Sequence, residues 1–160
     1  MALAFIGLGS NLGDRAAALQ FAVDAFRETK GVESVRCSTF YETTPVGPVP
    51  QGDFLNAVAA VETSLSPVTL LTLGQSIEQH AGRKRDIHWG PRTLDVDLLA
   101  YDRLKLSTKA LTLPHPEAYH RAFVLAPWAE LAPNFLLNGK AVAEWLAEVG
   151  NQGIRKFDCG

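Results

Sequence analysis

The chain contains little cysteine and no long hydrophobic run. Two of its 160 residues are cysteines, Cys37 and Cys159, and neither belongs to a CxxC or CxxH pair. This spacing argues against a zinc site or a disulfide framework and favours a reducing compartment. No run approaches the roughly 18–20 apolar residues of a membrane-spanning helix. The N-terminal residues also lack the basic segment of a signal peptide. We therefore expect a cytoplasmic protein.

The charges are nearly balanced, with 15 lysines and arginines against 17 aspartates and glutamates and a net charge of −2. This balance predicts no broad surface for nucleic acid or membranes, although it allows a local basic cluster. Hydrophobic residues make up 47% of the chain, which is enough for one core. We expect a single domain over residues 1–160 and, because no apolar patch is left over, a monomer.

The usual nucleotide-binding motifs are missing. The sequence has neither a GxxxxGK[ST] P-loop nor the motif set of protein kinases. The stretch GLGSNLG at residues 7–13 has the form GxGxxxG, which differs from a dinucleotide-binding fingerprint. By itself this stretch indicates a structural glycine turn.

The predicted elements follow the order β-α-β-β-α-β as far as residue 102. Strands are expected at residues 2–8, 32–43, 54–65 and 93–102, with helices at 14–29 and 66–80. A hairpin at 103–113, short helices at 122–132 and 140–150, and an edge strand at 154–158 should follow. This order is typical of the ferredoxin-like split βαβ unit, so we predict an α+β fold with a mostly antiparallel sheet.

The stretch RTLDVDLLAYD at residues 92–102 places two aspartates inside an apolar strand. Because side chains alternate along a strand, Asp95 and Asp97 share one face, with Cα atoms about 6.6 Å apart. Two ionised carboxylates at that spacing repel each other. Mg²⁺ removes this repulsion and is typically held by one or two carboxylates together with substrate phosphates. A solvated strand face, or salt bridges to nearby arginines, is the simpler explanation of the pair alone.

A cationic segment lies just before this strand and contains Arg83, Lys84, Arg85, His88, Trp89 and Arg92. Such a segment could neutralise the aspartates, or it could grip phosphates that an aspartate-bound metal also contacts. Arginine suits the second role because its guanidinium group binds phosphate oxygens in pairs. Polyphosphate transfer needs positive charge on several sides of the reacting group.

Four blocks of the chain together resemble the 6-hydroxymethyl-7,8-dihydropterin pyrophosphokinase family. They are FIGLGSNLGDR, YETTPVGPVPQGDFLNAV, GRKRDIHWGPRTLDVDLLAYD and LPHPEAYHRAFVLAPWAELAP, in the order in which the family has them. The third block is the most specific and departs from the family pattern at His88, where arginine is usual. The resemblance implies transfer of the β,γ-pyrophosphate of ATP to the hydroxymethyl group of a reduced pterin, with AMP as the second product.

The resemblance also implies a set of site residues. Asp95 and Asp97 would be the protein ligands of two Mg²⁺ ions. Asp97, Arg83 and Arg92 would act in catalysis. Asp97 is the better candidate of the two aspartates for deprotonating the substrate hydroxyl; the alternative is that a metal-polarised hydroxyl close to the phosphorus needs no dedicated base. Contacts with ATP are implied for Glu78, Arg83, Arg85, Trp89, Arg92, His115 and Arg121. Contacts with the pterin are implied for Gly9, Asn11, Thr43, Thr44, Val46, Phe54, Asn56 and Phe123.

The pterin contacts have a chemical rationale. Phe54 and Phe123 would sandwich the flat bicycle, and Asn56 can both donate to and accept from its polar edge. Some members of the family have tyrosine at the position of Phe54, and stacking does not need that hydroxyl. Two alternatives remain open on the residues alone: a binding module without activity, and a related phosphotransferase that acts on another hydroxymethyl heterocycle.

Overall fold

The structure is a computed structural model, and it describes residues 1–43, 53–81, 94–150 and 152–157. The first part of the chain contains β1 (Ala2–Ser10), α1 (Arg15–Arg27), β2 (Val32–Cys37), β3 (Tyr41–Thr43), β4 (Phe54–Thr63), α2 (Pro67–His80) and β5 (Asp95–Tyr101). The second part contains β6 (Leu106–Ser107), β7 (Thr112–Leu113), η1 (Ala118–His120), α3 (Ala122–Leu131), β8 (Leu136–Leu137), β9 (Lys140–Ala141), α4 (Val142–Val149) and β10 (Arg155–Lys156). Among the described helices, none is long and apolar enough to cross a membrane.

The main sheet has the order β10-β3-β4-β1-β5, and β2 also pairs with β4. β1 and β2 are joined by α1 and both pair with β4 between them, which is a split βαβ unit. The pairings of this sheet are antiparallel. The α+β prediction is therefore confirmed. The hairpin predicted after β5 is formed by β6 and β7, whereas the hairpin of β8 and β9 was not predicted.

The prediction of one strand over residues 32–43 was wrong, because the chain leaves the sheet at Ser38. The backbone N–H of Ser38 donates to the Val58 carbonyl over 2.9 Å, and the Ser38 hydroxyl accepts from the Val58 N–H over 3.0 Å. The hydroxyl thus takes the place of a strand carbonyl, and the backbone is free to turn. As a result β2 pairs with one half of β4 and β3 with the other half.

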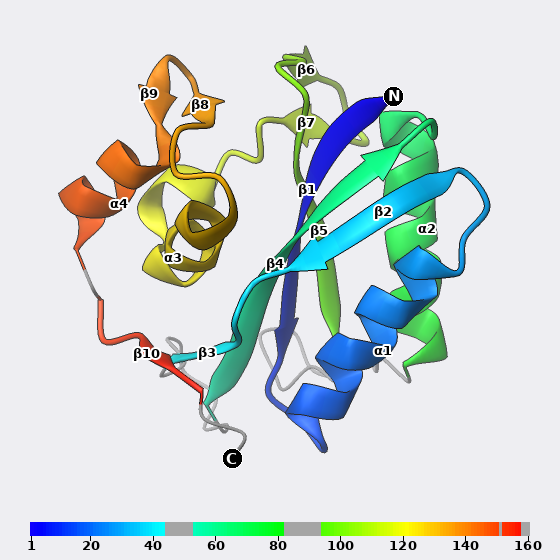
Figure 1. Cartoon of the computed structure of the whole chain (residues 1–160), viewed down its shortest axis with the longest axis horizontal. Coiled ribbons are helices and arrows are strands. Elements are labelled where there is room, and N and C mark those ends of the chain that lie inside the picture. The colour runs from blue at the N-terminus through cyan, green and yellow to red at the C-terminus, as the bar shows by residue number, and fades with distance from the viewer. Residues whose placement is uncertain (44–52, 82–93, 151, 158–160) are drawn as a thin grey trace.

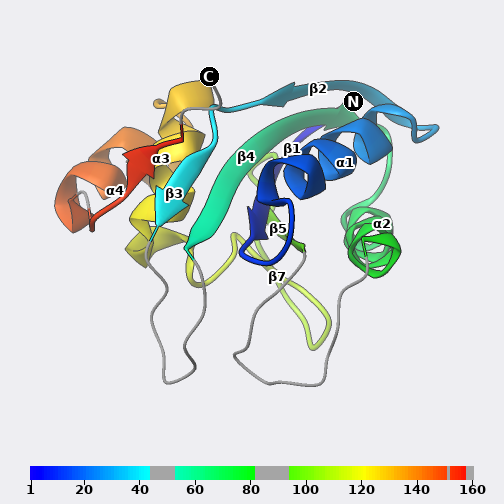
Figure 2. The same cartoon turned by 90° about the horizontal axis from the view of Figure 1, so that it is seen from below.

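Each face of the sheet is covered by a different pair of helices (Figures 1 and 2). The core under α1 and α2 includes Ile6, Leu8, Leu19, Val23, Phe26, Leu55, Leu70 and Ile77. The core under α3 and α4 includes Phe5, Val58, Leu99, Leu125, Trp128, Leu137 and Val142. α1 has apolar residues on one side at the spacing of a helix, and Asp14 caps its start by accepting from the N–H of Ala17.

A carboxylate fixes α3 to the start of β3. Glu130 accepts hydrogen bonds from the Thr39 N–H at 3.0 Å, the Thr39 hydroxyl at 2.6 Å and the Tyr41 hydroxyl at 2.9 Å. Burial by itself would raise the pKa of Glu130, but the hydrogen bonds from Thr39 and Tyr41 outweigh it and the pKa is lowered. Burial and the hydrogen bond to Glu130 raise the pKa of Tyr41 to about 12.

Glu130→Gln is expected to flatten the dependence of stability on acid pH. Because the pKa of Glu130 is lower in the folded state than its ordinary value of 4.5, its ionised form stabilises the fold above that value. The stabilisation is lost as pH falls through the folded pKa. We expect the variant to be less stable at neutral pH and to match the wild type more closely at about pH 3 in urea titrations. The exposed Glu144 supplies the control, Glu144→Gln, and an equal difference at both pH values would contradict the prediction.

Candidate active site

Three strands bring predicted site residues into one row. Gly9 of β1 lies opposite Asn56 of β4 and opposite Asp95 of β5, and Gly7 lies opposite Asp97. Residues directly opposite each other in antiparallel strands have their side chains on the same face. The amide and the two carboxylates therefore share the face that α3 and α4 cover only in part. The alternate residues of β5 are buried in the core under α1 and α2, as predicted.

Gly9 leaves the middle of this row without a side chain. A Cβ atom at Gly9 would lie 3.0 Å from Asn56 Oδ1 and 3.9 Å from Phe54 Cδ1. The first of these separations is closer than ordinary van der Waals contact, so alanine would displace the Asn56 amide. The glycine thus provides a flat strip of backbone between the amide on β4 and the carboxylates on β5.

A buried amide and hydroxyl lie at one end of the row. Asn56 is 6% exposed and Thr43 is 7% exposed. Asn56 Nδ2 donates to Thr43 Oγ1 over 3.1 Å, while its Oδ1 is directed toward Gly9. Phe54, opposite Thr43, is half-buried. An aromatic face beside a fixed amide suits a flat heterocycle with a polar edge. Asn11, which follows β1, is also buried.

The other end of the row carries the aspartate pair. Asp95 is half-buried and Asp97 is exposed. Asp97 has no hydrogen bond or ion pair with any residue in the described ranges. Within those ranges there is also no group of three or more potential metal-ligating side chains. A cation held here would take further oxygen ligands from water or from a bound phosphate, as Mg²⁺ commonly does.

Two predicted ATP contacts are attached to β5, the strand that carries both aspartates. Glu78 of α2 is 5% exposed, and its Oε2 accepts from the Val96 N–H over 2.8 Å. The backbone N–H of His115 donates to the Leu99 carbonyl over 2.8 Å. His115 Nδ1 accepts from the Glu117 N–H over 3.2 Å, which leaves Nε2 as the protonated nitrogen of the neutral ring. His115 can therefore donate to a phosphate oxygen.

Arg121 and Phe123 lie at the start of α3. The guanidinium carbon of Arg121 is 5.6 Å from the centre of the Phe123 ring, and Arg121 lies 3.9 Å from Glu117. Gln152 fixes this segment, because its side chain accepts from the Ala122 N–H and donates to the His120 carbonyl. The two Gln152 contacts span 30 and 32 positions of the chain, and no local pattern predicted them.

Several predicted site residues lie outside the described residues. They are Thr44 and Val46 of the pterin set, and Arg83, Arg85, Trp89 and Arg92 of the ATP set. His88, the departure from the family pattern, also lies there. The described residues nevertheless bring together one amide, two carboxylates and a strip of glycine backbone.

Comparison with known families identifies the chain. Residues 5–133 match the family model described as 7,8-dihydro-6-hydroxymethylpterin-pyrophosphokinase. The chain belongs to this family. The resemblance drawn from the four sequence blocks is thus confirmed.

Named relatives extend the match to nearly the whole chain. A 2-amino-4-hydroxy-6-hydroxymethyldihydropteridine pyrophosphokinase of Methylorubrum extorquens is 44% identical over 99% of this chain and 100% of its own. The proteins of the same name from Bacillus subtilis and Pseudomonas aeruginosa are each 42% identical over 96% of this chain, and cover 89% and 95% of their own chains.

Solved structures support the same fold. The wild-type HPPK-DHPS of Plasmodium falciparum, crystallised with pteroate, superimposes with a TM-score of 0.71 at 15% identity over 92% of this chain. This chain spans 42% of the length of that protein. At this level of identity the likeness shows the fold alone.

Proposed function

We propose that this chain transfers pyrophosphate from ATP to 6-hydroxymethyl-7,8-dihydropterin and so forms the pterin diphosphate and AMP, a step of folate biosynthesis. The row formed by Asn56, Gly9 and Asp95 carries this proposal. β4 and β5 are separated by β1 alone, so the amide and the carboxylate lie about 10 Å apart across the sheet. A bicyclic pterin with its hydroxymethyl arm can bridge that span.

The polar edge of the pterin would be bound by Asn56 and Thr43. Oδ1 of Asn56 accepts from a donor on the ring, and the hydrogen bond to Thr43 holds the amide in that orientation. Phe54 and Phe123 would contact the two faces of the ring. Gly9 and Asn11 would form one wall, and Thr44 and Val46 are the further contacts that the family resemblance implies.

Asp95 and Asp97 would hold two Mg²⁺ ions. The residues fit this role because they supply two carboxylates on one face, and because Asp97 has no partner among the described residues. When bound, Mg²⁺ would neutralise phosphate charge and polarise the substrate hydroxyl. Asp97 is the more exposed of the two, so its carboxylate is the better placed to accept the proton of that hydroxyl.

The triphosphate would lie over β5. His115 would donate from Nε2 to a phosphate oxygen, and Arg121 would add a positive charge at the start of α3. Glu78 would stabilise this part of β5, because it accepts a hydrogen bond from the N–H of Val96, the residue between the two aspartates. This role would add to the ATP contact that the resemblance implies. Arg83 and Arg92, with Arg85 and Trp89 near them in the sequence, would grip the phosphates and neutralise the charge that develops during transfer.

A product assay tests the reaction type. The protein is incubated with ATP, Mg²⁺ and 6-hydroxymethyl-7,8-dihydropterin, and the nucleotides are then separated. We expect AMP that appears only when the pterin is present and that is abolished when EDTA removes the metal. ADP in place of AMP would indicate simple phosphoryl transfer. Folded protein that forms neither nucleotide would favour a binding module without activity.

A further inference from the structure

Four charged side chains form a cluster at the start of β4, close to the pterin-binding residues. Arg15 Nη1 contacts Glu42 Oε2 at 2.9 Å and the Asp53 carbonyl at 3.0 Å. Arg155 Nη2 contacts Asp53 Oδ2 at 2.5 Å, and its Nε lies 3.7 Å from Glu42 Oε1. The two arginines, which come from α1 and β10, therefore bridge β3 to the residue that precedes β4.

The cluster lies on the opposite face of the sheet from the proposed pterin site. Glu42 is paired with Leu55, which is fully buried in the core under α1 and α2. The neighbours of Glu42 in β3 are paired with Asn56 and Phe54, whose side chains alternate with that of Leu55. A molecule bound over Asn56 thus cannot touch Glu42 or the arginines bound to it. The cluster can therefore affect pterin binding only by changing the position of β3 or β4.

β3 is short, and the Glu130 carboxylate of α3 holds only its start, at Thr39 and Tyr41. The strand contains three residues, and its outer neighbour β10 contains two. Its pairing with β4 determines whether the Thr43 hydroxyl meets the Asn56 amide, the hydrogen bond that orients this amide. A short pair of this kind is weak by itself. The ion pairs of Arg155 and Arg15 with Glu42 add a restraint at the middle residue of β3.

The cluster has a more exposed half, in which the side chains of Arg155 and Asp53 are 48% and 38% exposed, and a less exposed half formed by Arg15 and Glu42. The side chains of Arg15 and Glu42 are 25% and 21% exposed, so water screens this pair less than a fully exposed pair. Arg15 also lies over the ring of Phe157, 5.5 Å from its centre, and the Phe157 N–H donates to the Phe40 carbonyl. The last described segment of the chain is thereby attached both to α1 and to the start of β3.

We propose that Arg155 is a positioning residue for the pterin site: through its ion pairs with Asp53 and Glu42, it holds β3 in the register that places Thr43 against Asn56. Arg155 lies beyond residues 5–133, the part of the chain that the family model matches. This inference rests on the proposed function and adds to it a residue that touches neither substrate.

The decisive variant is Arg155→Ala, measured by steady-state production of AMP with each substrate varied in turn. Loss of two partly exposed ion pairs should raise the KM for the pterin about fivefold, with kcat and the KM for ATP within about twofold of the wild type. Arg155→Lys keeps one charge and should restore part of the pterin affinity. Hydrogen exchange of the Thr43 amide should become faster in Arg155→Ala even without substrate.

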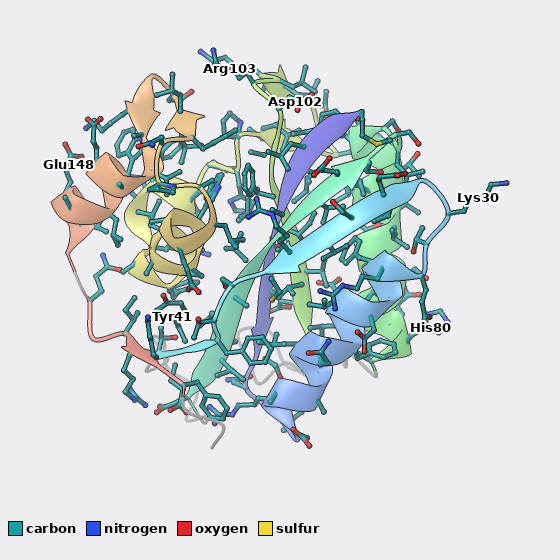
Figure 3. The ribbon with its side chains drawn as sticks, in the orientation of Figure 1. Lys30, Tyr41, His80, Asp102, Arg103 and Glu148 are labelled. Carbon is teal, nitrogen blue, oxygen red and sulfur yellow. The ribbon has the colours of Figure 1, made fainter. Side chains whose placement is uncertain are left out.

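Arg103→Ala is the matched control, because Arg103 is an exposed arginine that Figure 3 places far from Tyr41 of β3. It should leave both KM values and the exchange of Thr43 unchanged. An unchanged pterin KM in active Arg155→Ala would overturn the inference. So would a proportional loss of kcat and of both affinities, since that pattern indicates general destabilisation.

The wild-type protein separates this inference from the proposed function. A wild type that forms no pterin-dependent AMP refutes the proposed function, and the role of Arg155 in pterin binding falls with it. If the wild type is active and Arg155→Ala leaves the KM for the pterin unchanged, only the positioning role is refuted. A selective rise in the pterin KM, partly reversed by lysine, supports both.

Discussion

Asp97→Ala is expected to lower kcat for pterin-dependent AMP formation by about 10³-fold. The variant removes one of two carboxylates that lie on the same face of β5 and that are proposed to hold the metal ions. Asp97 has no hydrogen-bond or ion-pair partner within the described part of the chain, so the substitution removes no such contact there. Removing one of two like charges should leave the melting temperature unchanged or slightly higher.

The assay for Asp97→Ala is run across a range of Mg²⁺ concentrations, because a lost ligand also raises the amount of metal needed. Asp24→Ala is the control, since Asp24 is an exposed carboxylate on α1. It removes the same charge and should retain wild-type activity. Full activity of folded Asp97→Ala at ordinary Mg²⁺ would exclude this residue as a metal ligand.

Asn56→Ala should raise the KM for the pterin by about 100-fold while the KM for ATP changes little. A site that recognises polar groups through buried hydrogen bonds loses much affinity when one partner is removed. Asn56 is 6% exposed. Its Nδ2 donates to the Thr43 hydroxyl, and its Oδ1 lies beside Gly9, where it can accept a hydrogen bond. The variant should also lose about 1 kcal/mol of stability, because the Thr43 hydroxyl loses its donor.

Titration with the pterin in the absence of ATP checks binding directly. Asn134→Ala alters an exposed asparagine and should bind the pterin as the wild type does. Urea titration of both variants reports how much of any change in affinity follows from loss of stability. A folded Asn56→Ala whose pterin affinity is within twofold of the wild type would remove Asn56 from the site.

Much of the main sheet could be predicted because its signals are local. Alternation along residues 94–98 places Leu94, Val96 and Leu98 in a core and turns both aspartates to the other face. Ser66 and Pro67 mark the start of α2, where the Ser66 hydroxyl accepts from the Thr69 N–H. Each of these features depends on neighbours only a few residues away.

Other features could not be predicted, because they depend on contacts between distant parts of the chain. The break at Ser38 arises from its hydrogen bonds with Val58. The burial of Glu78 arises because β5 offers the Val96 N–H at the edge of the sheet. Arg155 reaches Asp53 across 102 positions. Composition and periodicity carry no information about such partners.

The sequence by itself determined the class of fold, the family and the shared face of Asp95 and Asp97, because side-chain alternation and a long motif are properties of a continuous stretch. The tertiary structure decided that Gly9 lies between Asn56 and Asp95, and that Arg155 forms ion pairs with Asp53 and with Glu42 of β3. The physical reason is register: packing of the whole sheet against its helices selects which residues stand opposite one another.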